Sequence, residues 1–401
     1  MRKLNVGILP MLFVAIALGA VTGRFSPDCV MRSLNSFCST FGQFIKFFVP
    51  FIVIGLVTPA IAETGKGAGK MLLVTMGIAY VSTIFSGAFA FGVAKTAFPH
   101  IINGSLSELS AIRAFPAYFT LEIPPLMGIT TALTISFIFG LAMVALDAPC
   151  LKQVFDEVRD VVTLTIRKMF LPLLPLYILA VIADITASGK LAVVGGGCVA
   201  IMLTAFCVTT SVLLIQYAVA GVIAGRNPFR ALWNMLPAYL TGWGCCSSAA
   251  TLPVTLRQTR KNGVSDKVTD LVIPLCSSVH LAGSMANMVI YTAGFIVLGG
   301  GTISLGQYAE FMFMLSIIAV ASPGIPGGVV LASATIAEAA LGFTPERYAL
   351  VIATYMALDG MGTACNLTGD GAIAIVVDRL LGRRECRKGA SFVGTVPAKA
   401  L

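Results

Sequence analysis

Long apolar runs separated by short polar segments make up most of the chain. A helix that crosses a bilayer needs roughly 20 predominantly apolar residues. Seven stretches fit that pattern, at about 5–23, 41–62, 71–98, 125–146, 164–187, 191–224 and 271–299. The first follows a basic start, as a signal peptide does, but it has near-spanning length and no clear cleavage site, so we expect a first membrane helix. The pattern predicts an all-α integral membrane protein.

Two later segments are apolar but interrupted in the middle. Phe229–Gln258 contains GCCSSAATLP (Gly244–Pro253), and Glu310–Leu341 contains SPGIPGG (Ser322–Gly328). Clusters of Gly and Pro stop a helix, and non-helical backbone at membrane depth must be lined by protein or water. Each segment therefore predicts a re-entrant hairpin of two short helices, with two ordinary kinked helices as the alternative. Paired interruptions of this kind indicate a transporter binding site.

The last predicted helix, about Pro345–Leu381, carries a stripe of polar side chains. Asp359, Thr363, Asn366 and Asp370 are spaced by four, three and four residues, which places them within roughly 60° of one face. A carboxylate at the bilayer centre costs about 2.5–3.5 kcal/mol on insertion scales, and such residues usually face a cavity. The stripe predicts a binding site, and a hydrogen-bond network that only joins helices is the alternative. Carboxylate and amide oxygens suit a small cation.

Composition and charge narrow the function class. The chain is 57% hydrophobic and 11% charged, against about 25% charged residues in soluble domains, which excludes a soluble enzyme or a nucleic-acid-binding domain. With the N-terminus inside, 20 of the 27 Lys and Arg residues fall on the inner side, which favours eight transmembrane helices with both termini cytoplasmic. Ten Cys without a CxxC pair and only two His make a zinc site unexpected. The sequence contains no Walker motif, which would indicate an ATP-driven pump. It also contains no Ser–His–acid arrangement of the kind that would indicate an enzyme.

Three short motifs carry a resemblance to a known family. SSAATLPVT (Ser247–Thr255), GIPGG (Gly324–Gly328) and NLTGD (Asn366–Asp370) resemble the two hairpin tips and the final-helix motif of the dicarboxylate/amino acid:cation symporters, the glutamate-transporter family. They occur in the family's order and spacing, and the resemblance covers essentially the whole chain. It implies a sodium-coupled symporter of the inner (plasma) membrane, built as a homotrimer of elevator-type protomers with inverted repeats.

The resemblance also implies a division of the chain. Scaffold helices 1 and 2 would lie in 1–70, helix 3 of the transport domain in 71–98, and scaffold helices 4 and 5 in 99–190. The transport-domain core would be 191–385, with helix 6, hairpin 1 at about 229–258, helix 7, hairpin 2 at about 310–341 and helix 8, followed by a cytoplasmic tail at 386–401. Substrate contacts implied by the family are Ser247, Ser248, Ile325, Pro326, Gly327, Asp359, Gly362, Thr363 and Asn366.

Departures from the family pattern predict the substrate. Asp359 matches the position that binds a substrate ammonium, which favours an amino acid. Acidic-substrate members place an Arg where this chain has Gly362, or just before the serine-rich tip, where it has Cys246. Without a guanidinium, a second substrate carboxylate would be buried unpaired. The sequence therefore predicts a small neutral amino acid such as serine, threonine or alanine. A C4-dicarboxylate or acidic amino acid symporter of the same fold and an ion-conducting channel are the alternatives.

The coupling-ion sites depart as well. The implied sodium ligands are His280, Ser322, Asn366 and Asp370, but His280 and Ala282 stand where the family has an Asn and an Asp that build a further sodium site. Fewer coupled sodium ions are therefore expected than in glutamate transporters. Because histidine titrates near physiological pH, a proton on His280 could replace a cation. A neutral histidine hydrogen-bonded in the core is the alternative.

Overall fold

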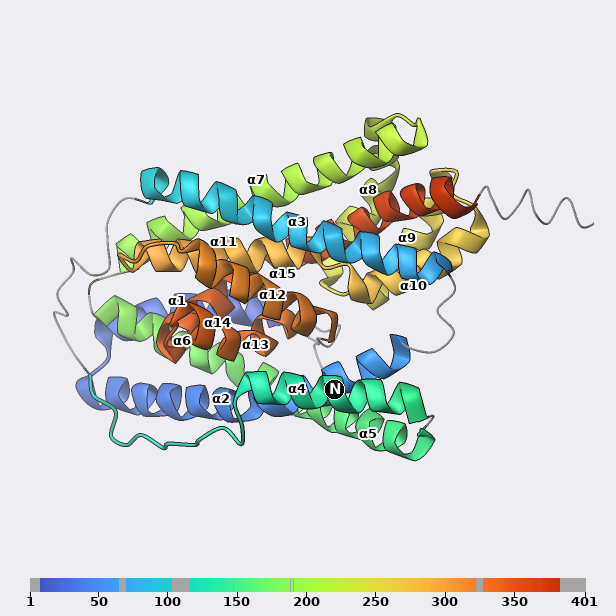
Figure 1. Cartoon of the computed structure of the whole chain (residues 1–401). Helices are drawn as coiled ribbons and strands as arrows, with labels where there is room; N and C mark the ends of the chain where they lie inside the picture. The colour runs from blue at the N-terminus through green and yellow to red at the C-terminus, as the bar shows by residue number, and fades with distance from the viewer. Residues whose placement is uncertain are drawn as a thin grey trace, which may run out of the picture.

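The chain folds into a bundle of long helices (Figure 1). The computed structural model describes residues 8–64, 70–102, 115–146, 148–187, 189, 191–321 and 327–382, and none of these lies in a β-strand. The α-helices are α1 (Ile8–Phe25), α2 (Asp28–Thr64), α3 (Lys70–Ile101), α4 (Ile129–Leu146), α5 (Pro149–Thr165), α6 (Leu171–Ala187), α7 (Leu191–Ala224), α8 (Pro228–Cys245), α9 (Ser248–Lys261), α10 (Asp266–Val279), α11 (Ala282–Leu298), α12 (Leu305–Ala321), α13 (Gly328–Ala332), α14 (Ala334–Leu341) and α15 (Pro345–Val377). Two short π-helical turns, η1 (Ile166–Phe170) and η2 (Asp378–Gly382), continue α5 and α15.

Several helices have membrane-spanning length, as the apolar runs predict. Within the described residues, five helical stretches are long and apolar enough to cross a bilayer: Asp28–Pro59, Lys70–Ile101, Pro149–Ala187, Val194–Ala224 and Asp266–Leu298. Three shorter apolar helices lie at Val14–Phe25, Thr134–Leu146 and Leu305–Ala319. These helices indicate a multi-pass membrane protein. The number of eight transmembrane helices stays a prediction.

Two predicted helices begin more than ten residues before their apolar runs do. The helix predicted from residue 41 begins at Asp28, and the helix predicted from 164 continues a helix that begins at Pro149. The added turns of α5 contain charged side chains such as Asp156 and Arg159, which form an ion pair at 3.0 Å. Apolar length alone locates the buried part of a helix and misses polar turns beyond it.

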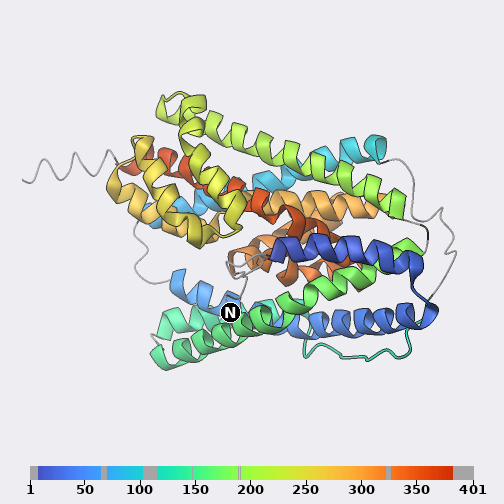
Figure 2. The same cartoon turned by 180° about the vertical axis from the view of Figure 1, so that it is seen from behind.

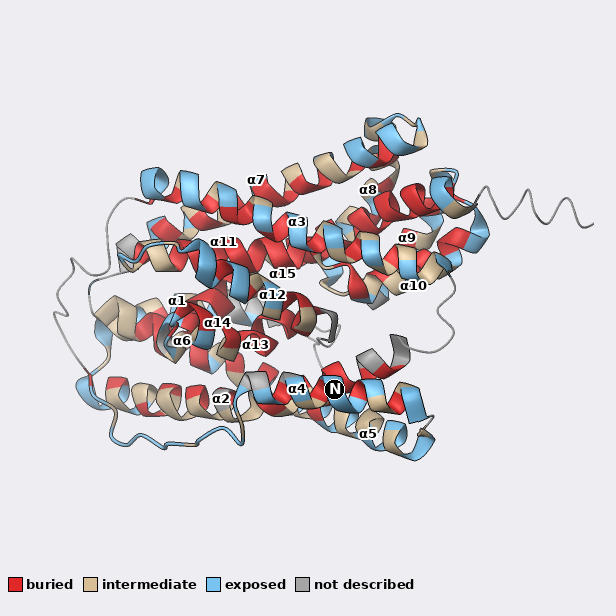
Figure 3. Ribbon diagram, in the orientation of Figure 1, coloured by how far each residue is buried: buried red, intermediate tan, exposed pale blue. Residues whose placement is uncertain are grey.

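Two sets of helices are distinguished by their packing (Figures 1 and 2). Helices α1, α2, α4, α5 and α6 pack on one another. Helices α3, α7, α8, α9, α10, α11 and α15 form the other set, and α11 and α15 are buried along most of their length (Figure 3). The short helices α12, α13 and α14 contact α2 on one side and α3, α11 or α15 on the other.

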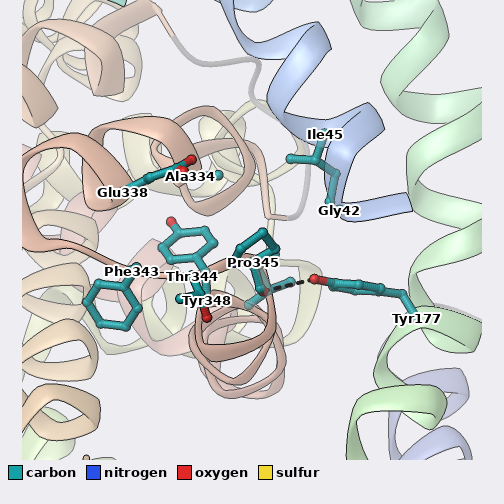
Figure 4. Close-up of a pocket in the computed structure, with 10 residues that line it drawn as sticks. Gly42, Ile45, Tyr177, Ala334, Glu338, Phe343, Thr344, Pro345 and Tyr348 are labelled. Carbon is teal, nitrogen blue, oxygen red and sulfur yellow. Dashed lines mark hydrogen bonds between the residues drawn. The ribbon is translucent and has the colours of Figure 1, made fainter. Parts of the chain in front are cut away.

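The two sets also meet directly at the start of α15 (Figure 4). The Tyr177 hydroxyl of α6 donates a hydrogen bond of 2.9 Å to the carbonyl of Pro345, and Tyr177 is 1% exposed. A Cβ at Gly42 of α2 would lie 3.0 Å from Pro345 Cβ, so this glycine lets the first turn of α15 approach closely. Glu338 and Tyr348 line the small pocket beside this contact.

The first interrupted segment forms a helical hairpin, as predicted. Helix α8 ends at Cys245, and Cys246 takes a left-handed conformation with φ +50°. Ser247 caps α9, because its side-chain oxygen accepts from the backbone N–H of Ala250 at 3.4 Å. The second interrupted segment forms α12 before the break and α13 and α14 after it. Most of its tip, 322–326, lies outside the described residues.

Candidate functional site

The polar stripe of α15 is buried in the centre of the helical bundle. Asp359, Thr363, Asn366 and Asp370 are 6%, 7%, 4% and 0% exposed, so the predicted shared face is a buried one. Their neighbours come from both hairpins, from α3 and α7, and from the junction of α10 and α11. Burial of four such groups requires polar partners, and those partners define the site.

The junction of α10 and α11 is a break that the sequence did not predict. A single helix was expected over 271–299, but His280 and Leu281 are non-helical and separate α10 from α11. The Asn366 side-chain oxygen accepts from the backbone N–H groups of Gly283 at 2.7 Å and Ser284 at 3.3 Å. Asn366 therefore caps α11 from outside, satisfying N–H groups that a helix start leaves free.

Helix α3 supplies the other partners of this break. The Thr83 hydroxyl accepts from the backbone N–H of Leu281 at 3.2 Å, and the Ser86 hydroxyl donates to the carbonyl of Ala282 at 2.7 Å. Tyr80 of the same helix donates to the carbonyl of Ser316 at 3.2 Å. The broken backbone is therefore lined by protein on two sides, as the bilayer environment demands.

A buried hydrogen-bond network surrounds His280. His280 Nδ1 lies 2.9 Å from Asp370 Oδ1, and neither side chain is exposed. His280 Nε2 lies 3.1 Å from Ser82 Oγ and 3.3 Å from the amide nitrogen of Gln216. Where the Gln216 amide donates to Nε2, that ring nitrogen accepts and the ring proton lies on Nδ1, where it is donated to Asp370. A neutral histidine satisfies these contacts in that arrangement, and its protonation state stays a prediction.

The same network leaves two oxygen atoms without a partner. Asp370 Oδ2 and Gln216 Oε1 are buried and make no hydrogen bond with the described residues. A Cβ on Gly369 would lie 2.6 Å from both Gln216 Oε1 and His280 Cε1, so the glycine at this position leaves room for both side chains as they lie here. A free carboxylate oxygen in a dry interior suits a small cation.

Replacing His280 tests its protonation state. In His280→Asn we expect sodium-dependent uptake to keep the pH profile of the unchanged protein between pH 6 and 8, because a neutral ring that donates to Asp370 carries no coupled proton. We also expect a lower thermal unfolding midpoint, since Ser82 and Asp370 each lose a buried partner at about 1–3 kcal/mol. Uptake into proteoliposomes, with and without a proton gradient at fixed sodium, measures the first effect. A pH profile that flattens in His280→Asn contradicts the neutral assignment and favours proton coupling.

Asp359 joins the last helix to the second hairpin. Asp359 Oδ2 accepts from the backbone N–H of Gly327 at 2.9 Å, and the Tyr355 hydroxyl is a second hydrogen-bond partner. Gly327 has φ +73°, and a Cβ there would lie 2.2 Å from Met356 Sδ, so this position requires glycine. Of the other hairpin residues predicted to contact substrate or sodium, Ser322, Ile325 and Pro326 lie outside the described residues.

The first hairpin reaches the same turn of α15. A Cβ on Gly360 would lie 2.1 Å from the Trp243 carbonyl oxygen and 3.1 Å from Cys246 Sγ. Ser247 and Ser248 are half-buried at the start of α9. Residues Asp359 and Gly360 thus lie where the two hairpins converge, which brings together residues that are more than 100 positions apart.

Two further polar residues of this region were missed from the sequence. Both side-chain polar atoms of Asn287 and the hydroxyl of Tyr291 are buried without a hydrogen-bond partner in the described residues. A Cβ on Gly362 would lie 2.9 Å from Asn287 Nδ2, and the Tyr291 ring packs edge-on against Tyr355 at 6.1 Å. The sequence does contain a signal for them. Ser284, Asn287 and Tyr291 are spaced by three and four residues, which places three polar side chains on one face of α11.

The charge of the interior is one-sided. Asp359, Asp370 and Asp378 are buried, whereas no Lys or Arg side chain is buried among those whose side chains the structure describes, a set that leaves out Lys46. Asp370 faces the imidazole of His280, and Asp359 faces neutral N–H and O–H donors. The arrangement can therefore hold cationic groups such as an ammonium or a sodium ion, and it offers no guanidinium to a second carboxylate.

Comparison with known families gives an independent result. A family model described as the sodium:dicarboxylate symporter family matches residues 8–380. The chain belongs to this family. Membership confirms the family resemblance found in the sequence, and the family is one of symporters rather than of enzymes.

Relatives within the sodium:dicarboxylate symporter family differ in their named substrates. The chain is 24% identical over 340 residues to a serine/threonine transporter of Streptococcus thermophilus, covering 79% of this chain and 81% of that protein. It is 23% identical over 439 residues to excitatory amino acid transporter 1 of Ambystoma tigrinum, covering 98% of this chain and 78% of that protein. It is 26% identical over 181 residues to neutral amino acid transporter A of Homo sapiens, an alignment that spans 45% of this chain and only 34% of the human protein.

Proposed function

We propose that the protein is a secondary active symporter that couples sodium entry to uptake of a small neutral amino acid such as serine, threonine or alanine. One observation carries the substrate class: Asp359 is buried beside neutral donors, and apart from Lys46, whose side chain is not described, no Lys or Arg side chain is buried in the described residues. An amino acid supplies the ammonium that Asp359 lacks. An acidic amino acid or dicarboxylate would add a carboxylate without a cationic partner.

The proposed substrate site lies between the two hairpins and the middle of α15. Asp359 binds the ammonium, and Thr363 and Asn366 hold the amino and carboxylate ends, as the resemblance implies. Ser247 and Ser248 on one hairpin and Ile325, Pro326 and Gly327 on the other enclose the substrate, and Gly362 leaves the side-chain end uncharged. A substrate ammonium that binds Asp359 must either share its carboxylate with the Gly327 N–H or displace that hydrogen bond. Substrate binding is therefore coupled to the position of the second hairpin.

Sodium is proposed to bind at Asp370. The unpartnered Oδ2 atom of Asp370 is the observation that supports this, because a buried carboxylate oxygen without a donor is a vacant cation ligand. Asn366 and Ser322 are the further ligands, but the Asn366 oxygen already accepts two backbone N–H groups and must exchange them to bind an ion. His280 takes one oxygen of Asp370, which supports coupling to fewer sodium ions than in the glutamate transporters.

The wider arrangement follows from family membership and packing. We propose eight transmembrane helices and two re-entrant hairpins, with α1, α2, α4, α5 and α6 as a static scaffold. The other packed set, with both hairpins, would move as an elevator within a homotrimer in the plasma membrane. The direct contact between Tyr177 and Pro345 is then one that each transport cycle must break. Both termini are placed in the cytoplasm by the distribution of Lys and Arg.

Uptake into proteoliposomes tests the function directly. We expect serine uptake driven by an inward sodium gradient, saturable, and inhibited by alanine and threonine but not by aspartate or succinate. Potassium in place of sodium should abolish it. Uptake of succinate or aspartate alone would overturn the substrate class and favour the dicarboxylate alternative. Current without saturable uptake would instead favour a channel.

A further inference from the structure

A basic pocket lies at the base of the first hairpin, far along the chain from the substrate residues of α15. It has a volume of about 430 Å³, and its walls come from the α7–α8 turn, the first turns of α8 and the end of α9. These elements gather at the end of the molecule where α15 also ends (Figure 1). The lining residues are Arg226, Asn227, Arg230, Ala231, Asn234, Lys261, Asn262 and Gly263.

The pocket is held in shape by its own hydrogen bonds. The Arg226 guanidinium donates to the backbone carbonyls of Asn262 and Gly263, so it ties the α7–α8 turn to the α9–α10 turn. The Asn262 amide donates to the carbonyl of Ala231 at 3.0 Å and accepts from Asn234 at 2.8 Å. The wall is therefore built before any ligand binds, which lowers the entropic cost of binding.

Charge in the pocket is positive and only partly neutralised. The Arg226 guanidinium lies 3.7 Å from the carboxylate of Asp378 in η2. That carboxylate also accepts hydrogen bonds from the backbone N–H and the hydroxyl of Ser265. Arg230 and Lys261 have no ion pair or side-chain hydrogen bond with the described residues, although neighbouring Arg260 is paired with Asp266 and Asp270. No carboxylate lines the pocket. Two unpaired cations and several amide groups are the chemistry that binds a phosphate group.

An exposed apolar stripe beside the pocket indicates which phosphate it binds. Phe229 and Trp233 are 72% and 73% exposed and lie one turn apart on α8, next to the face that carries Arg230 and Asn234. Val222 at the end of α7 is 84% exposed. Aromatic side chains of this kind lie at the membrane interface, where acyl chains meet headgroups. A free phosphate ion has no apolar part that could pack on this surface.

We propose that the pocket is a binding site for the phosphate headgroup of an anionic phospholipid. Arg230 and Lys261 contact the phosphate, and Phe229 and Trp233 lie along its acyl chains. Basic pockets between helices at a membrane surface bind such headgroups. A bound lipid bridges α8 and α9 and holds the base of the first hairpin together. The proposal requires that the chain lies in a membrane, and it does not depend on the identity of the transported substrate.

Lipid binding can be measured on the purified full-length protein in a neutral detergent. We expect native mass spectrometry to show phosphatidylglycerol retained about 25-fold better than phosphatidylcholine, since each unpaired cation contributes about fivefold. Phosphatidylglycerol should also raise the thermal unfolding midpoint. The double variant Arg230→Gln/Lys261→Gln should lose both effects. The matched control, Arg257→Gln/Lys152→Gln, removes the same charge from exposed residues outside the pocket and should keep both.

Each other outcome counts against the proposal. Equal loss of selectivity in the two double variants would mean that net charge alone attracts the lipid. Equal retention of the two lipids by the unchanged protein would mean that the pocket selects no anionic headgroup. A midpoint rise with inorganic phosphate in phosphatidylcholine micelles that equals the rise with phosphatidylglycerol would assign the pocket to a free anion. Failure of serine uptake would leave this measurement unaffected, so the two proposals stand or fall separately.

Discussion

Replacing Asp359 by asparagine is expected to lower sodium-dependent serine uptake by about 100-fold and to leave the thermal unfolding midpoint unchanged or higher. Asparagine keeps the shape of the side chain and an oxygen that can accept from the Gly327 N–H. It removes the charge that pairs with the substrate ammonium, and removing one partner of a buried charge pair weakens binding strongly. A neutral amide is also less costly to bury than a carboxylate, so the substitution does not lower the free energy of unfolding.

Asp378→Asn is the matched control for this experiment. Asp378 is also 6% exposed and follows directly on α15, but its carboxylate binds Ser265 and Arg226 instead of facing the proposed site. Asp378→Asn should lower the midpoint and keep serine uptake per folded protein, the opposite of Asp359→Asn. Uptake by radiolabelled serine and thermal unfolding in detergent give the two readouts. A loss of uptake in both variants in proportion to lost stability would make Asp359 a structural residue only.

Apolar length and clusters of Gly and Pro predicted the helices and the first hairpin from the sequence. These signals are local, because a run of apolar residues or the segment around Cys246 and Ser247 determines its own backbone preference. Helix ends were predicted less well. Helix α5 begins at Pro149 without a side-chain cap from Ala148, and a proline at the first helical position is a start signal that hydropathy does not record.

The break at His280 and Leu281 could not be predicted, because its partners are distant in sequence. Asn366 caps α11 from 83 positions away, and Thr83 accepts from Leu281 across 198 positions. The pairing of His280 with Asp370 likewise joins residues 90 positions apart. The stripe on α15 showed that a polar site exists. Only the folded chain shows that one oxygen of Asp370 is engaged and the other free.

The position of Gly362 leads to the second large prediction. In Gly362→Arg we expect serine uptake to be lost without any gain for aspartate, because a Cβ at 362 would lie 2.9 Å from Asn287 Nδ2. The arginine side chain can therefore enter only if the Asn287 side chain shifts, and Asn287 itself is buried. In Gly362→Arg/Asn287→Ala that space opens, and we expect aspartate to bind about 10- to 100-fold more tightly than to the unchanged protein, through a bidentate Arg–carboxylate pair.

Aspartate-induced thermal stabilisation in sodium, measured against serine, provides the readout for this pair of variants, since stabilisation reports binding even where transport fails. Gly362→Met/Asn287→Ala is the control, because methionine occupies similar space without a charge and should bind neither substrate well. Stabilisation by aspartate in the arginine double variant alone would show that a missing guanidinium excludes acidic substrates. If neither double variant responds, the exclusion comes from elsewhere in the site. If Gly362→Arg alone responds, Asn287 does not restrict this position, and the neutral substrate class then follows from Gly362 by itself.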